Sequence, residues 1–282
     1  MSRALRAHWP EYLIEAALLG TFMVWAAAVA TLLAATPASA PRALPSPLGA
    51  VHGALAALGA GAAGPPLARR ALMGAAMGLT AIALIYSPWG RRSGGHMNPA
   101  MTLSFLWLGK VAGWDALFYV LAQTIGAAAG VLVAGRWLGG AFTAPPVHYI
   151  VTMPGGGGAV VAFAAEAGIS SVLMGTVLAV SNSRHARWTG LCAGLLVALY
   201  VTFEAPLSGT SMNPARSFAS ALAAGSWQSF WVYVVAPPLG MLLAAALYVA
   251  ARGRAAVRCA KLHHGAAGAC IFRCGYRAAE GR

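Results

Sequence analysis

The sequence predicts an all-α membrane protein with six transmembrane helices and two re-entrant half-helices, arranged as an inverted repeat. Three observations support this fold class. Of 282 residues, 59% are hydrophobic and 9% are charged, and the mean hydropathy of +0.70 lies outside the range of ordinary soluble domains. The segment 208–217, SGTSMNPARS, repeats the pattern of the segment 93–102, SGGHMNPAMT. Each copy begins a helix-forming run that is too short to cross a bilayer.

The two copies contain the residues that start a helix. In each, Asn can cap the N-terminus and Pro is tolerated at the first helical position. The runs that follow, 99–108 and 214–224, are succeeded by Gly and hold far fewer than the ~20 residues that a span needs. Irregular backbone at membrane depth is tolerated only where protein buries it or where it lines a water-filled path. The pair therefore predicts a pore or a central binding site.

Long apolar runs place the six spans in one membrane domain, residues 12–251. In chain order the expected spans are 12–33, 71–86, 114–133, 159–180, 188–203 and 230–251. The halves, 12–134 and 159–251, each hold three spans and one half-helix, so their topologies are opposite. A short N-terminal segment, 1–11, precedes this domain, and a basic tail, 252–282, follows it.

Two segments near the N-terminus have alternative interpretations. The basic start, the apolar run and Ala38-Ser-Ala40 imitate a secretory signal, but the run is longer than an h-region of ~7–15 residues and contains Glu15. We expect a first transmembrane helix there. Residues 36–66, rich in Pro, Ala and Gly, are expected to form a long external loop, although the apolar part 48–63 imitates a short span.

The distribution of basic residues predicts the orientation. With the N-terminus inside, fourteen of the 19 Lys and Arg residues are cytoplasmic, as are both termini, and only Arg42, Arg69, Arg70 and Arg136 are external. The net charge of +13 thus serves topology and contact with the lipid bilayer, and we expect no nucleic-acid partner. The abundance of Ala, Gly and Arg with only two Lys indicates a GC-rich bacterium and its inner membrane.

The repeated motif in this setting resembles the aquaporin and glycerol-facilitator family, the major intrinsic proteins. The resemblance covers roughly residues 10–251 and includes Ser-Gly-x-His before the first Asn-Pro-Ala and Arg after the second. It implies a passive channel for water or small uncharged solutes such as glycerol, urea or ammonia, assembled as a homotetramer. The residues that it places at the pore centre are Asn98, Pro99, Ala100, Asn213, Pro214 and Ala215.

Simple electrostatics explains what such a centre does. Each half-helix presents about half a positive charge at its N-terminus, so two facing N-termini repel cations. The amides of Asn98 and Asn213 would donate to one passing oxygen, which turns its own hydrogens outward. A continuous hydrogen-bonded wire for protons is thereby interrupted, while neutral solutes pass.

The resemblance also implies an outer selectivity filter. Its members here are Arg216, Val201, Thr210 and either Met77 or Gly78. Water-specific relatives carry His where this chain has Val201, and many glycerol facilitators carry Asp where it has Ser217. Neither subgroup is matched, and we expect a wider and more apolar constriction that passes small solutes beside water.

Four further polar residues in apolar segments are candidates. The resemblance implies that Glu15 and Glu166 brace the loops before the half-helices with support from Gln123, and that His96 lines the pore on the cytoplasmic side. The alternative for the two acids is a proton relay, and for His96 loop packing. A proton-coupled transporter of a small neutral solute is therefore the competing function, and a receptor or scaffold with a closed pore is a third.

The tail contains the remaining chemistry-bearing residues. Cys259-x3-His263 and Cys270-x3-Cys274 offer soft ligands for a tetrahedral zinc ion, although not at the usual two-residue Cys spacing. The alternative, a basic tail held near anionic lipid, leaves the chain without a metal. No paired nucleophile and base and no phosphate loop is recognisable, so we expect no enzymatic activity and no cofactor.

Overall fold

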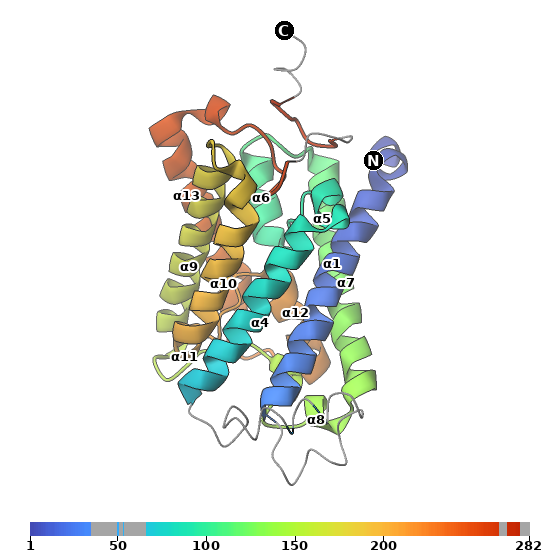
Figure 1. The fold of residues 1–282 in the computed structure, drawn as a ribbon, viewed down its shortest axis with the longest axis vertical. Helices are drawn as coiled ribbons and strands as arrows, with labels where there is room; N and C mark the ends of the chain where they lie inside the picture. Colours follow the sequence, from blue (N-terminus) through green and yellow to red (C-terminus); the bar gives the residue numbers. More distant parts are fainter. Residues whose placement is uncertain (35–49, 51–52, 54–65, 265–269, 277–282) are drawn as a thin grey trace.

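Six long helices run side by side as a bundle in the computed structural model, which describes residues 1–34, 50, 53, 66–264 and 270–276 (Figure 1). Each is long and apolar enough to cross a membrane, the fifth when it is counted from Ala186 to Phe203, so the predicted all-helical fold with six spans is confirmed. These helices are α1 (Ser2–Ala34), α4 (Pro66–Tyr86), α7 (Gly113–Leu138), α9 (Gly158–Ser181), α10 (Thr189–Phe203) and α13 (Phe230–Arg252). Helix α1 already begins at Ser2, so residues 2–11 continue the first span as helix.

Two short helices fill the interior of the bundle. Helix α6 (Pro99–Trp107) and helix α12 (Pro214–Ala224) have the starts that the motif predicts. Asn98 and Asn213 accept backbone N–H groups as N-caps, and Pro occupies the first turn of each helix. From their adjoining N-termini the two helices run towards opposite ends of the molecule (Figure 1).

The ends of the bundle carry the short elements. We call the end that holds Met1 and the tail the tail end, and the other the loop end (Figure 1). The short elements are α5 (Pro88–Ser93), α8 (Gly140–Thr143), α11 (Ala205–Ser208), η1 (His148–Ile150), η2 (Ala186–Trp188) and η3 (Arg254–Ala256). The expected external loop 36–66, with its segment 48–63, lies almost wholly outside the described residues.

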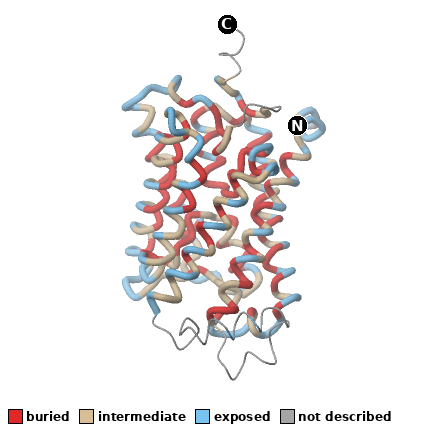
Figure 2. Tube along the Cα trace, in the orientation of Figure 1, coloured by how far each residue is buried: buried red, intermediate tan, exposed pale blue. Residues whose placement is uncertain are grey.

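The halves of the repeat are built from matching helix pairs. Helix α1 packs along α7 and helix α9 along α13, while α4 packs along α10. Gly126 faces the backbone of Ala16 so closely that a Cβ atom would collide with it, and Gly240 faces Ala167 in the same way. Small residues permit such close approach of helices in membranes. Buried residues accordingly face the interior, and exposed residues cover the outside (Figure 2).

The chain after α13 folds back over the tail end. Its backbone N–H groups at Leu262 and Arg273 donate to the carbonyls of Gly94 and Lys110, at 3.0 and 2.9 Å. Tyr276 donates through its hydroxyl to the last turn of α9. The described part of the tail is thus packed against the bundle.

Candidate functional site

The loop that leads into α6 is held by a buried carboxylate. Glu15, on α1, accepts hydrogen bonds from the backbone N–H groups of His96 and Met97, at 3.1 and 2.7 Å, and from the Ser93 hydroxyl. Gln123 of α7 adds an amide donor at 2.8 Å. The backbone of Met97 is left-handed, with φ of 47°, a conformation that is uncommon for a non-glycine residue. The carboxylate therefore holds in place a turn that the chain would otherwise avoid.

The loop that leads into α12 has the same arrangement on the other half. Glu166, on α9, accepts from the backbone N–H groups of Ser211 and Met212, at 2.6 and 2.7 Å, and from the Ser208 hydroxyl. Met212 also has a left-handed backbone, with φ of 53°. Both acids thus lie where the sequence expectation put them, beside the half-helix loops.

The two half-helices are tied together at their N-termini. The Asn98 amide donates through Nδ2 to the Met212 carbonyl at 2.7 Å, and the Asn213 amide donates to the Met97 carbonyl at the same distance. Each side-chain oxygen meanwhile caps its own helix. An amide has two N–H bonds, and these contacts use one of them. One donor on each Asn is left for a molecule in the space beside the pair.

That space is a cavity of ≈ 600 Å³ that extends along the bundle. Its lining includes Arg69 at the loop end, Arg216, both capping Asn residues and, at the tail end, Leu262. Apolar side chains predominate, among them Leu19, Phe22, Met73, Leu173 and Val197. An apolar wall with a few convergent donors is typical of a site for small molecules.

The predicted filter residues mostly reach this cavity. Arg216, Val201 and Thr210 all line it. Among the described residues, the Nη1 atom of Arg216 is buried without a hydrogen-bond partner. A buried donor that lacks a partner costs about 1–3 kcal/mol, so this atom is available for an oxygen inside the cavity.

The structure separates the two candidates on α4. Met77 lines the cavity, whereas Gly78 faces α10, where an added Cβ would lie 2.5 Å from the Gly194 oxygen. Gly78 is therefore a helix-packing position. Met73, one turn earlier on α4, also lines the cavity and was missed by the sequence count. Its signal was its i, i+4 spacing from Met77 on one helix face.

A second residue missed from the sequence is Glu204, which follows α10. Its Oε2 accepts from the Thr210 hydroxyl at 2.5 Å, and its Oε1 is buried without a partner among the described residues. Glu204 therefore orients the predicted filter threonine. An acid at the end of an apolar helix, six residues before Thr210, was the available signal.

At the tail end His96 lies in the cavity wall but is covered. Its Nδ1 lies 3.0 Å from the Thr102 hydroxyl, and its Nε2 lies 2.8 Å from the Ala260 carbonyl of the tail. The rings of Phe105 and Phe272 both stack on the imidazole, with ring centroids 5.2 and 5.3 Å from its own. The sequence did not predict this contact with the tail.

The tail residues with soft ligand atoms do gather, with one change. The ligand atoms of Cys259, His264, Cys270 and Cys274 all lie within 4.8 Å of one another. His263, which the sequence spacing suggested, instead packs its ring edge-on against Tyr86 at 4.9 Å. The adjacent histidine takes its place because the backbone directs neighbouring side chains to different sides.

Comparison with known proteins identifies relatives along most of the chain. The family model described as Major intrinsic protein matches residues 9–248. Aquaporin NIP1-3 of Oryza sativa subsp. japonica is 36% identical over 173 residues, which are 61% of this chain and 58% of the relative. Aquaporin-4 of Rattus norvegicus is 36% identical over 174 residues, 59% of this chain and 52% of the relative. The chain thus spans between about half and three fifths of the length of these curated relatives.

A solved structure shows the same fold. The aquaglyceroporin from Plasmodium falciparum matches with a TM-score of 0.64 and 18% sequence identity. The match covers 86% of this chain and 96% of that one.

Proposed function

This chain belongs to the major intrinsic protein family, and we propose that it forms a passive transmembrane channel for water and small uncharged solutes such as glycerol, urea or ammonia. The observation that carries the proposal is the cavity of ≈ 600 Å³ that passes the joined N-termini of α6 and α12. A path along a bundle of six apolar helices is the arrangement that a channel needs.

The centre of the path accounts for the exclusion of ions. The N-termini of α6 and α12 each contribute about half a positive charge, which repels cations in a site of low dielectric constant. The free N–H bonds of Asn98 and Asn213 bind the oxygen of a passing molecule from one side. That molecule cannot then donate in line with the next one, and proton transfer along the path is broken.

The outer part of the path accounts for the solutes. Arg216 offers a donor to a hydroxyl or carbonyl oxygen and repels cations, while Met77 and Val201 offer apolar surface to a carbon skeleton. Such a lining suits molecules that are polar on one side and apolar on the other. We therefore propose that small uncharged solutes pass beside water.

The hydrogen bonds of the two buried acids argue against coupling to protons. Glu15 and Glu166 accept from backbone N–H groups with both carboxylate oxygens, and these bonds stabilise the left-handed turns. A relay acid must exchange its proton during transport, which would release these turns in each cycle. Bracing is the role that the contacts favour.

The setting of the channel follows from its surface. Large apolar side chains such as Ile125, Leu79 and Leu247 are exposed on the outer faces of the helices, as contact with lipid requires. We propose a homotetramer in a bacterial inner membrane, with both termini cytoplasmic according to the distribution of basic residues. Chemical cross-linking in membranes, resolved by denaturing electrophoresis, tests the tetramer.

Stopped-flow light scattering on reconstituted proteoliposomes tests the channel. We expect fast water flux, and glycerol and urea flux above that of empty liposomes. Arg216→Ala should raise the permeability to larger solutes relative to water, since it removes the charged side of the constriction. Arg136→Ala is the matched control, because Arg136 is an exposed arginine in the last turn of α7. Water flux with complete solute exclusion contradicts the wide filter, and absence of any flux, with a metal chelator as well as without it, contradicts the channel.

A further inference from the structure

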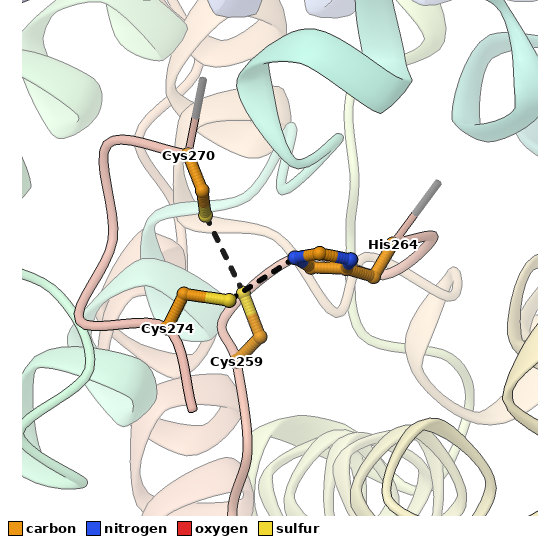
Figure 3. Close-up of side chains that lie close together, drawn as sticks. All are labelled: Cys259, His264, Cys270 and Cys274. Atoms are coloured by element: carbon orange, nitrogen blue, oxygen red, sulfur yellow. Dashed lines mark hydrogen bonds between the residues drawn. The ribbon is translucent and has the colours of Figure 1, made fainter. Parts of the chain in front are cut away.

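Four soft ligand atoms converge in the tail, outside the channel (Figure 3). The side chains of Cys259, His264, Cys270 and Cys274 point towards one another, and their ligand atoms lie within 4.8 Å. The Cys259 and Cys270 sulfurs are 3.6 Å apart, and the His264 Nε2 atom is 3.1 Å from the Cys274 sulfur. None of the three cysteines is in a disulfide.

This set has the chemistry of a structural zinc site. Three thiolates and one imidazole in tetrahedral array are typical zinc ligands, with Zn–S distances of about 2.3 Å. Two sulfurs at that distance from one tetrahedral ion are separated by about 3.8 Å, close to the observed separation of Cys259 and Cys270. The buried Lys261 supplies a nearby positive charge.

The ligands bracket the tail residues that cover the cavity. Cys259 and His264 flank a short stretch of the tail. In this stretch the Ala260 carbonyl lies 2.8 Å from His96 Nε2, and Leu262 lines the cavity. Cys270 and Cys274 flank Phe272, whose ring stacks on His96 at 5.3 Å. One ion bound by all four residues would therefore join both covering segments.

We propose that Cys259, His264, Cys270 and Cys274 bind one Zn²⁺ ion, and that the bound ion holds the tail as a cap that closes the tail end of the cavity. The first part stands on the tail alone, and the second rests on the proposed channel function. Without the ion, the covering segments are held to the bundle by hydrogen bonds, such as the one from Leu262 N–H to the Gly94 carbonyl, and by the packing of buried side chains such as Leu262 and Phe272. The zinc-free protein then opens more often.

Metal analysis of the full-length purified protein tests the site. We expect about one zinc ion per chain. Cys270→Ser and His264→Ala should each lower zinc affinity by at least about tenfold, since even residues that only support a ligand have effects of that size. Their matched controls are Cys192→Ser, a cysteine of α10 outside the cluster, and His263→Ala, the neighbouring histidine outside the cluster. Both controls should retain zinc.

Three results would overturn the site. The first is that the wild-type protein holds no zinc after purification in zinc-containing buffer. The second is that Cys270→Ser and Cys192→Ser have equal zinc content. The third is a disulfide between Cys259 and Cys270 in protein purified from cells with a reducing cytoplasm. Thiol counting by mass spectrometry detects the last of these.

Water permeability of proteoliposomes tests the cap. Chelation of zinc from the wild type and the Cys270→Ser substitution should each raise permeability several-fold, and Cys192→Ser should respond to the chelator as the wild type does. Equal flux with and without zinc contradicts the cap while leaving the channel intact. No flux from any form, including the zinc-free ones, contradicts the channel and the cap together, whereas the zinc content still decides the site.

Discussion

The two halves of the repeat share their backbone supports but differ in the side chains that face the cavity. In each half a tyrosine, Tyr119 or Tyr233, donates to the carbonyl of the serine that begins the half-helix loop, at 2.6 and 2.7 Å. Three residues before each half-helix, however, the first loop has His96 and the second has Ser211. The third residue of the half-helix is Met101 in α6 and Arg216 in α12.

This difference shows which parts of the site the fold requires. A left-handed turn that ends at a helix-capping Asn needs a buried acceptor for its backbone N–H groups, whatever passes through the cavity. Both halves provide such an acceptor. The variable positions instead set the two ends of the path. Arg216 leaves a donor open to the cavity near the loop end, while His96 is closed by the tail at the other.

The largest expected effect separates the two acids. Glu166→Ala leaves three buried donors without an acceptor, each at a cost of about 1–3 kcal/mol, and should lower the free energy of unfolding by at least about 3 kcal/mol. Glu15→Ala should cost less, because the buried Oε1 of Gln123, which has no partner among the residues that the structure describes, can turn to accept one of the N–H groups that lose Glu15. The second half has no such substitute acceptor at this place, because Pro237 of α13 occupies the position that corresponds to Gln123 of α7. The midpoints of thermal unfolding in detergent decide between these values, and equal losses would contradict the role of Gln123.

The next prediction concerns the pair that the halves share. Asn98→Asp and Asn213→Asp each remove an N–H donor to a methionine carbonyl in the other half, at a cost of about 1–3 kcal/mol. Each also places a carboxylate between the positive helix N-termini, so cations and protons should leak through both variants alike. A pH-sensitive dye inside proteoliposomes measures this leak. A leak through one variant alone would show that the centre is not symmetric.

The smallest expected effect isolates the added support in the first half. Gln123→Leu keeps most of the side-chain volume but removes the amide that donates to Glu15, which should lower the free energy of unfolding by about 1.5 kcal/mol. Combined with Glu15→Ala, the substitution should bring the loss of stability up to that of Glu166→Ala. A double-mutant cycle measures the coupling between the two residues. If the two losses of unfolding free energy were strictly additive, the coupling between Glu15 and Gln123 would be refuted.

Much of the fold was predictable because its signals are local. An Asn cap followed by Pro specifies a helix start within a few residues, and apolar runs specify the spans. The starts of α6 and α12 at Pro99 and Pro214 follow from these rules. The repeated Asn-Pro-Ala motif also indicated that the two starts belong together.

The remaining details depend on how helices rotate against each other. A residue count could not separate Met77 from Gly78, because the close contact of Gly78 with Gly194 sets which face of α4 meets the cavity. The position of Glu204 beside Thr210 depends on the turn after α10. Likewise, the choice of His264 over His263 depends on the tail folding back over the bundle, which no spacing in the sequence reveals.

The temperature dependence of water flux in proteoliposomes, measured with and without a pH gradient, tests the central claim most directly. A passive path past Asn98 and Asn213 predicts weak temperature dependence and equal flux in both conditions. Steep temperature dependence, or flux that follows the pH gradient, would contradict a passive channel and favour a carrier that uses Glu15 or Glu166.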